Sequence, residues 1–137
     1  MDAVLNATEV RSNFGGFIDN VVRVKPQFVK RNRDVIASMS IPQLKSLLSA
    51  YEFTFEYEET DGKFVGSLEQ IEDIIGEGDT LDQLKLDLAS QLIEYSSEYF
   101  ADFDGYQAAP NRKDHAPYIL RALIYDSVNE VAELLHG

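Results

Sequence analysis

Apolar residues recur at helical spacing near the start of the chain and predict an amphipathic helix after a short strand at Val4–Leu5. The residues of its apolar face are Val10, Phe14, Phe17, Ile18 and Val21. Thr8 is expected to cap this helix and to place Glu9 in its first turn, where a carboxylate suits the helix dipole. The pair Gly15–Gly16 costs roughly 1 kcal/mol per glycine relative to alanine in a helix. We expect it to admit the backbone of a second copy of the chain.

The pattern changes after Pro26 to alternation, which predicts two short strands. They run through Phe28–Val29 and through Val35–Met39, and a tight turn at Asn32–Arg33 joins them. Asparagine tolerates the left-handed conformation of such a turn. Ser40 and Gln43 then form a capping box, which predicts a short helix lined by leucines.

A longer hairpin follows. Apolar and charged residues alternate from Phe53 to Glu58, and Asp61–Gly62 is a strong signal for a turn into a return strand. Ser67–Asp73 is expected to form a helical turn, and Ile74–Ile75 to form a third strand. Gly76 and Gly78 would then mark a break in the chain.

The longest helical pattern begins at Thr80, which forms a capping box with Gln83. Its apolar stripe consists of Leu81, Leu84, Leu88, Leu92, Tyr95 and Tyr99. Two more helices are expected in the tail, one capped by Asp114 and one capped by Ser127. The expected fold is α+β in three parts: an N-terminal domain (residues 1–51), a hairpin with a long helix (52–108) and a helical tail (109–137).

Charge is distributed unevenly along the chain. Residues 1–50 hold seven basic and four acidic side chains, a net charge of +3, which leaves −15 for the remainder of the total of −12. Such an asymmetry suggests two different partners, although acidity alone also serves solubility. Lys30, Arg31 and Arg33 cluster at the first hairpin turn, and Arg11 lies near the start of the first helix. By themselves these cations are compatible with DNA binding and also with a solvated basic hairpin.

Several function classes are excluded. The chain has no cysteine, no phosphate-binding loop and no arrangement of serine, histidine and aspartate that suggests a catalytic triad, so we expect no enzyme and no cofactor. Asp102–Gly105 lacks most ligands of a calcium loop, and His115 and His136 are expected to be isolated surface residues. The start of the chain lacks the features of a signal peptide, and no apolar run spans a bilayer, so a cytoplasmic protein is the default expectation.

The first fifty residues resemble the Phd/YefM family of antitoxins from bacterial toxin–antitoxin modules. Family members carry a helix with A-R-x-N-L, then I-T-R before a turn, then a strand that ends in serine. Arg11 and Asn13 match the first motif, with Phe14 in place of leucine, and Arg31 matches the second. The likeness covers roughly residues 3–51, and it lacks the usual glycine in the turn.

This resemblance implies a homodimer or higher even oligomer that binds the operator DNA of its own promoter and represses its operon. It assigns Arg11 and Arg31 as the DNA-contacting pair and Asn13 as a further contact, to which Lys30 and Arg33 are added on charge. It also implies a cognate toxin, expected to be a ribonuclease. The alternative that the residues leave open is a stand-alone transcriptional regulator whose acidic part binds another protein or a small ligand.

Residues 52–100 are similar to HicB-type antitoxin domains, in which a hairpin with D-G leads to G-D-T-L and a long helix. Tyr57–Leu68 and Gly78–Leu84 carry the likeness. Acidic and aromatic residues near the end of the long helix are the expected toxin contacts, namely Glu94, Glu98, Tyr99, Phe100, Asp102, Phe103, Asp104 and Tyr106. The alternative is that the aromatic ones belong to the domain's own core.

Overall fold

The computed structural model describes residues 3–137 and divides the chain into two compact units, residues 1–47 and 48–137. We call them the N-terminal unit and the C-terminal unit. Among the described helices, none combines the length and apolar character needed to cross a bilayer. The boundary lies close to the one expected at residue 51, whereas residues 109–137 are part of the C-terminal unit and do not form a separate tail.

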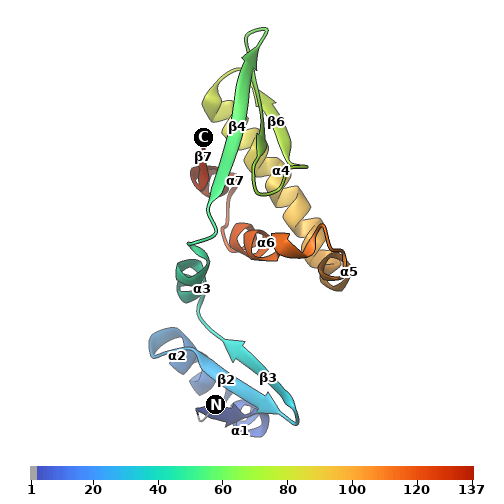
Figure 1. Ribbon diagram of the computed structural model, residues 1–137. Coiled ribbons are helices and arrows are strands. Elements are labelled where there is room, and N and C mark those ends of the chain that lie inside the picture. The colour runs from blue at the N-terminus through green and yellow to red at the C-terminus, as the bar shows by residue number, and fades with distance from the viewer. Residues whose placement is uncertain (1–2) are drawn as a thin grey trace. The chain divides into compact units, whose positions relative to one another are not determined.

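The N-terminal unit contains a three-stranded sheet in the order β1-β2-β3 (Figure 1). Strand β1 (Val4–Asn6) runs parallel to β2 (Gln27–Arg31), and β2 runs antiparallel to β3 (Asp34–Ser38). Two residues connect β2 to β3, and Asn32 takes the left-handed conformation with φ 57°. The predicted turn at Asn32–Arg33 is therefore confirmed, because asparagine supplies the positive φ that a two-residue hairpin requires.

The first helix is interrupted, contrary to the prediction of one continuous helix. It consists of α1 (Ala7–Ser12) and α2 (Phe14–Arg23), separated at Asn13. The side chain of Asn13 caps α2 by accepting a hydrogen bond from the Gly16 backbone at 3.2 Å. A Cβ atom on Gly16 would lie 2.5 Å from Asn13 Nδ2, so this glycine makes room for the cap.

The caps of the two short helices were predicted with mixed success. Asn6, rather than Thr8, caps α1, and its side chain accepts a hydrogen bond from Thr8 N at 2.7 Å. The capping box before α3 (Ile41–Leu48) is present on one side, since Gln43 N donates to Ser40 Oγ at 3.3 Å. Asparagine is at least as favourable as threonine at the N-cap. The cap of α1 is therefore Asn6, two residues before the predicted Thr8, and it uses the same kind of side-chain hydrogen bond.

The C-terminal unit contains a four-stranded sheet in the order β6-β5-β4-β7. Strands β4 (Phe53–Thr60), β5 (Lys63–Leu68) and β6 (Ile75–Gly78) form an antiparallel meander, and β7 (Leu135–His136) pairs in parallel with Phe53 and Thr54. Asp61 and Gly62 both have positive φ, as the predicted turn requires. The expected helical turn at Ser67–Asp73 is wrong, because Ser67 and Leu68 complete β5 and a loop leads to β6.

The helices of this unit are α4 (Leu81–Ala101), α5 (Phe103–Ala108), the 3₁₀ turn η1 (Lys113–His115), α6 (Ala116–Leu123) and α7 (Val128–Glu133). Thr80 caps α4, as predicted, by accepting from Gln83 N at 3.1 Å. Ser127 caps α7 in the same way at 3.2 Å, whereas Asp114 makes no capping hydrogen bond to α6.

Glycines of the meander let α4 approach the sheet closely. Gly76 and Gly78 lie within β6, so the expectation that they mark a break in the chain is wrong. A Cβ atom on Gly78 would lie 2.5 Å from the backbone nitrogen of Leu84, and one on Gly66 would lie 3.2 Å from the Leu84 side chain. The sheet and α4 can therefore touch backbone to backbone at this point.

The core lies between the sheet, α4 and the C-terminal helices. Its fully buried side chains include Phe53 from β4, Leu84, Leu88 and Leu92 from α4, Ile119 from α6, and Val131 and Leu135 from the chain's end. Residues 109–137 thus complete the core, which is why they cannot be a separate tail. The predicted α+β class is correct, and Figure 1 shows α4 running along the meander.

Candidate functional site

The basic surface of the N-terminal unit lies around the β2–β3 turn. Lys30 and Arg31 end β2, Arg33 occupies the turn, and all three side chains are exposed. The strand register places Lys30 beside Asn6, the residue that caps α1. The start of α1 and the tip of the hairpin therefore lie next to one another in this unit.

Arg11 lies in the last turn of α1, which packs against β1 and β2, and its side chain is exposed. Asn13 is also exposed, but its Oδ1 already accepts the capping hydrogen bond from Gly16. The amide nitrogen of Asn13 is the group that remains to donate to a ligand. Asn13 therefore has a structural role that the sequence motif did not reveal.

The four predicted DNA-contacting cations of this unit, the three at the turn and Arg11 on α1, are not neutralised within the described residues 3–137. Arg11, Lys30, Arg31 and Arg33 take part in none of the salt bridges there, whereas Arg23 pairs with Asp19 at 2.7 Å. Unpaired, solvated guanidinium groups can each offer a two-pronged hydrogen bond to a phosphate or to guanine. The arrangement suits a polyanion.

The expected toxin contacts divide into two groups. Glu94, Glu98, Asp102 and Asp104 are exposed, and Phe100 keeps 58% of its surface accessible. Tyr99 is completely buried, and Phe103 and Tyr106 pack partly against the core. The expectation that Tyr99 offers a contact surface is corrected, because its ring stacks on Tyr106 with centroids 4.7 Å apart inside the unit.

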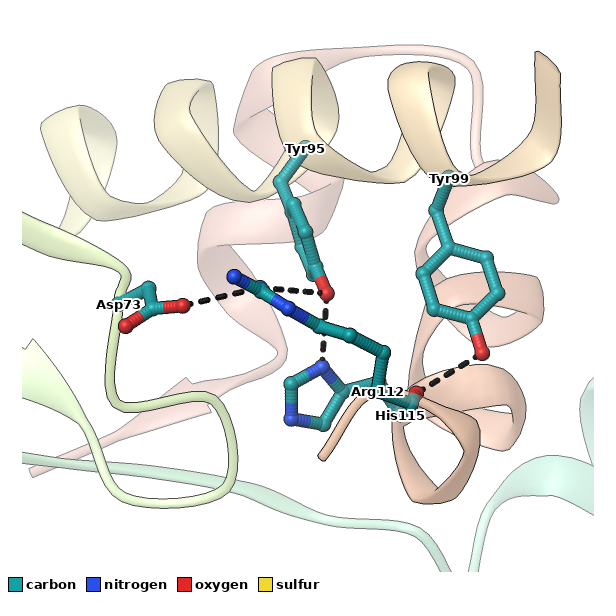
Figure 2. A network of polar contacts seen from close by, with 5 residues as sticks. All are labelled: Asp73, Tyr95, Tyr99, Arg112 and His115. Atoms are coloured by element: carbon teal, nitrogen blue, oxygen red, sulfur yellow. Dashed lines mark hydrogen bonds and ion pairs between the residues drawn. The ribbon is translucent and has the colours of Figure 1, made fainter. Parts of the chain in front are cut away.

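A polar network joins α4 to the connector before α6 (Figure 2). Arg112 Nη1 donates to Tyr95 Oη at 3.0 Å and pairs with Asp73 Oδ2 at 2.9 Å. The Tyr95 hydroxyl also contacts His115 Nδ1 at 2.8 Å, and Tyr99 Oη donates to the carbonyl of Arg112 at 2.9 Å. One arginine thus ties the loop before β6, the long helix and η1 together.

The surroundings shift the pKa values of three groups in this network. Burial raises the pKa of Tyr95 despite the opposing effect of Arg112, and the hydrogen bond from Arg112 to Tyr95 raises the pKa of Arg112. Burial and then the positive charge of Arg112 lower the pKa of His115. A neutral His115 is therefore favoured, and the expectation of an isolated surface imidazole is wrong because Tyr95 and Arg112 adjoin it.

Sequence reasoning missed this network because its members come from three segments far apart in the chain. A signal was nevertheless present: Tyr95 and Tyr99 lie one turn apart on the apolar stripe of a helix, and a buried tyrosine hydroxyl requires a partner. The network holds the segment from Arg112 to His115 against α4, so its role is to stabilise the fold. Within residues 3–137, no group of three or more metal-ligating side chains occurs.

The two units together define a class of protein that combines a small cationic module with an acidic α+β domain. The model of the PHD_like family, described as antitoxin of toxin–antitoxin, RelE/RelB, TA system, matches residues 1–137. The chain belongs to this family of antitoxins and is not an enzyme. The match covers the C-terminal unit as well as the part that resembled Phd/YefM proteins.

A solved structure supports this assignment. The chain is similar to the antitoxin part of a putative toxin/antitoxin system from Syntrophomonas wolfei subsp. wolfei, with 39% identity and a TM-score of 0.90. The similarity covers 97% of this chain and 96% of that one, so both units share its fold. No curated protein matches the sequence.

The lowered pKa of His115 predicts that acid destabilises the C-terminal unit. An unfolded histidine has a pKa of about 6.5, so below this value the unfolded chain binds a proton that the folded chain resists until its own, lower pKa is reached. The free energy of unfolding should therefore fall as the pH drops through this window, and His115→Gln should reduce the fall.

Urea unfolding at pH 7 and at pH 5 measures this effect. All seven tyrosines lie in the C-terminal unit and the chain has no tryptophan, so tyrosine fluorescence reports on that unit alone. His136→Gln is the control, because His136 is exposed in β7. Equal pH dependence in wild type and His115→Gln would contradict the prediction.

Proposed function

We propose that this antitoxin binds operator DNA of its own operon through the N-terminal unit, as a dimer, and neutralises a cognate toxin through the C-terminal unit. The observation that carries the DNA-binding part is the set of exposed, unpaired cations on a unit that belongs to an otherwise acidic chain. Binding at the promoter would repress the operon. Both activities belong in the cytoplasm, which stays a prediction.

Arg11 and Arg31 are the proposed principal DNA contacts, with Lys30 and Arg33 beside them and the amide nitrogen of Asn13 as a further donor. Cations of this kind mainly contact phosphates and set the position of a protein on the duplex. Base contacts by an arginine fork would add sequence preference. The negative charge of the C-terminal unit would repel DNA and so confine binding to the N-terminal unit.

Dimerisation is supported by apolar surface that α2 leaves uncovered. Phe14, Ile18 and Val22 follow one another at intervals of four residues along α2, and their exposed fractions are 56%, 43% and 56%. In the described part of this unit, Val21 and Val29 are the buried apolar side chains. A stripe of this kind on so small a core requires a cover, and a second copy of the unit would supply one. Gly15 adjoins the stripe, and a Cβ atom there would meet nothing within 4 Å.

The toxin is proposed to contact the acidic end of α4 and the turn that follows. Glu94, Glu98, Asp102 and Asp104 supply negative charge around Phe100, the exposed apolar anchor. A basic ribonuclease would be steered to this surface by charge and held by burial of Phe100. The likeness of residues 52–100 to HicB-type domains stays a prediction that depends on the sequence motifs.

Removal of either proposed principal DNA contact should weaken operator binding. Arg11→Ala and Arg31→Ala are each expected to cost roughly 1–3 kcal/mol and to lower the salt dependence of binding. Gel shifts with the promoter fragment at several salt concentrations measure both quantities. Arg23→Ala removes the same charge from an arginine that is already paired with Asp19, so it should bind nearly as wild type. Equal loss in all three variants would point to a general charge effect.

A charge placed on the α2 stripe should prevent dimerisation. Ile18→Glu would bury a carboxylate in the interface, so sedimentation velocity should show a monomer at concentrations where the wild type is a dimer. Asn20→Glu, on the same helix at an exposed polar position, should stay dimeric. If the Ile18→Glu variant is still a dimer, the apolar stripe of α2 does not form the dimer interface.

The toxin hypothesis is tested by co-expression with the protein encoded next to this chain's gene. If that protein is the toxin, it arrests growth alone, and this chain restores growth and co-purifies with it. Glu94→Lys combined with Glu98→Lys should weaken the complex, whereas Asp126→Lys with Glu133→Lys, an equal reversal on exposed residues elsewhere in the unit, should not. A neighbour that neither arrests growth nor binds would favour a stand-alone regulator.

A further inference from the structure

One edge of the four-stranded sheet is open. Strand β4 has eight residues, but its outer neighbour β7 has two and pairs with Phe53 and Thr54 alone. Among the described residues, no strand pairs with β4 on that side from Glu56 to Thr60. All five of these residues are exposed.

The backbone groups that face this open side can be identified from the register. Glu69 N donates to Thr54 O at 2.9 Å, so the even-numbered residues of β4 direct their N–H and C=O groups toward β5. The odd-numbered residues direct theirs away from β5. Tyr57 and Glu59 therefore present free donors and acceptors at the open edge, as an added strand requires.

The opposite edge of the sheet is shorter and is closed at one position by α4. Ile75 and Glu77 are the residues of β6 whose backbone faces outward, and the Glu77 N–H donates to Asp87 Oδ2 of α4 at 2.8 Å. A side chain of the long helix thus satisfies one outward donor of β6, whereas no such contact occurs at the outer edge of β4 among the described residues. An uncovered edge of this length is a site for pairing with another chain.

Charge indicates the kind of chain that fits. Glu56 and Glu58 lie on the sheet face away from α4, and Glu59 lies on the face toward α4. The nearby Lys63 does not neutralise them, because it is paired with Glu77 at 3.8 Å. Two β4 strands paired with each other would bring these glutamates together, which is unfavourable. A strand with lysine or arginine at alternate positions would place its charges beside Glu56 and Glu58.

We propose that β4 from Glu56 to Thr60 accepts an extended basic segment of the toxin as an additional strand. This inference rests on the proposed toxin binding and adds a second contact to the one at the end of α4. Backbone hydrogen bonds at Tyr57 and Glu59 would supply affinity, and the glutamates would select the basic partner. Tyr57 is 46% exposed and rests on Phe64, so it can also cover apolar side chains of the added strand.

Amide hydrogen exchange of the full chain, with and without the toxin encoded by the neighbouring gene, tests the proposal directly. In the free chain the Tyr57 and Glu59 amides should exchange fast, while those of Glu56 and Glu58, bonded to β5, exchange slowly. Saturation with the toxin should slow Tyr57 and Glu59 by about tenfold or more. Unchanged exchange at both amides in the saturated complex would overturn the proposal.

A pair of variants at Glu59 separates the backbone from the side chain. Glu59→Pro and Glu59→Ala both remove the carboxylate, but only proline removes the outward N–H, a change that edge strands tolerate. Binding to the toxin should weaken at least about tenfold further in Glu59→Pro than in Glu59→Ala. Tyrosine fluorescence in urea checks that both variants fold, and the exchange experiment on the wild-type chain decides the matter if the proline variant does not.

The outcomes also separate this inference from the proposed function. If the wild-type chain binds no toxin, the proposed function fails. If it binds and Glu59→Pro binds as tightly as Glu59→Ala, toxin binding stands and strand addition at β4 is refuted. If binding is lost only on reversal of Glu94 and Glu98, the end of α4 is the contact and β4 is not.

Discussion

The fold of the C-terminal unit depends on the burial of helix α4 between two layers. Leu84, Leu88 and Leu92 of α4 are completely inaccessible to solvent, because the meander covers the helix on one side and α6 and α7 cover it on the other. Full burial of a leucine contributes roughly 1.5–3 kcal/mol. Both the meander and the C-terminal helices pack on α4, and Phe53 of β4 also contacts Tyr118 of α6.

This constraint explains why the C-terminal unit is a folded domain. Antitoxin segments that order themselves only on binding lack an apolar core, whereas here residues 53–135 share one. The polar network around Arg112 completes the arrangement, since it fastens the segment before α6 to Tyr95 and Tyr99. A partner of this domain therefore meets a preformed surface and incurs little cost for ordering the chain.

The N-terminal unit is built by a different rule. Few of its side chains are buried, and α2 displays Phe14, Ile18 and Val22 to solvent. Its sheet and caps define the backbone, and its stability would increase on association with a second copy. Within the described residues, Arg11, Arg31 and Arg33 of this unit are exposed and form no salt bridge. The C-terminal unit thus has an extensive core and a net negative charge, whereas the N-terminal unit has few buried side chains and a net positive charge.

The sequence by itself determined the elements that depend on local chemistry. The turns at Asn32–Arg33 and Asp61–Gly62, the caps at Thr80 and Ser127 and the stripe of α4 follow from residue types within a few positions of one another. The family also followed from local motifs in the first fifty residues, and the match over the whole chain extends it.

Tertiary structure alone decided what depends on distant residues. The break at Asn13 competes with a continuous apolar pattern, and the cap stands because Gly16 leaves room for it. Tyr99 is buried, and residues 109–137 contribute Ile119, Val131 and Leu135 to the core, because α4 needs a second cover that no local pattern specifies. The open edge of β4 likewise depends on the short pairing of β7, and the outward N–H of Glu77 in β6 depends on the position of Asp87 in α4. Caps and turns depend on residues that are neighbours in the sequence, so the sequence predicts them. Packing depends on contacts between residues far apart in the sequence, so only the tertiary structure determines it.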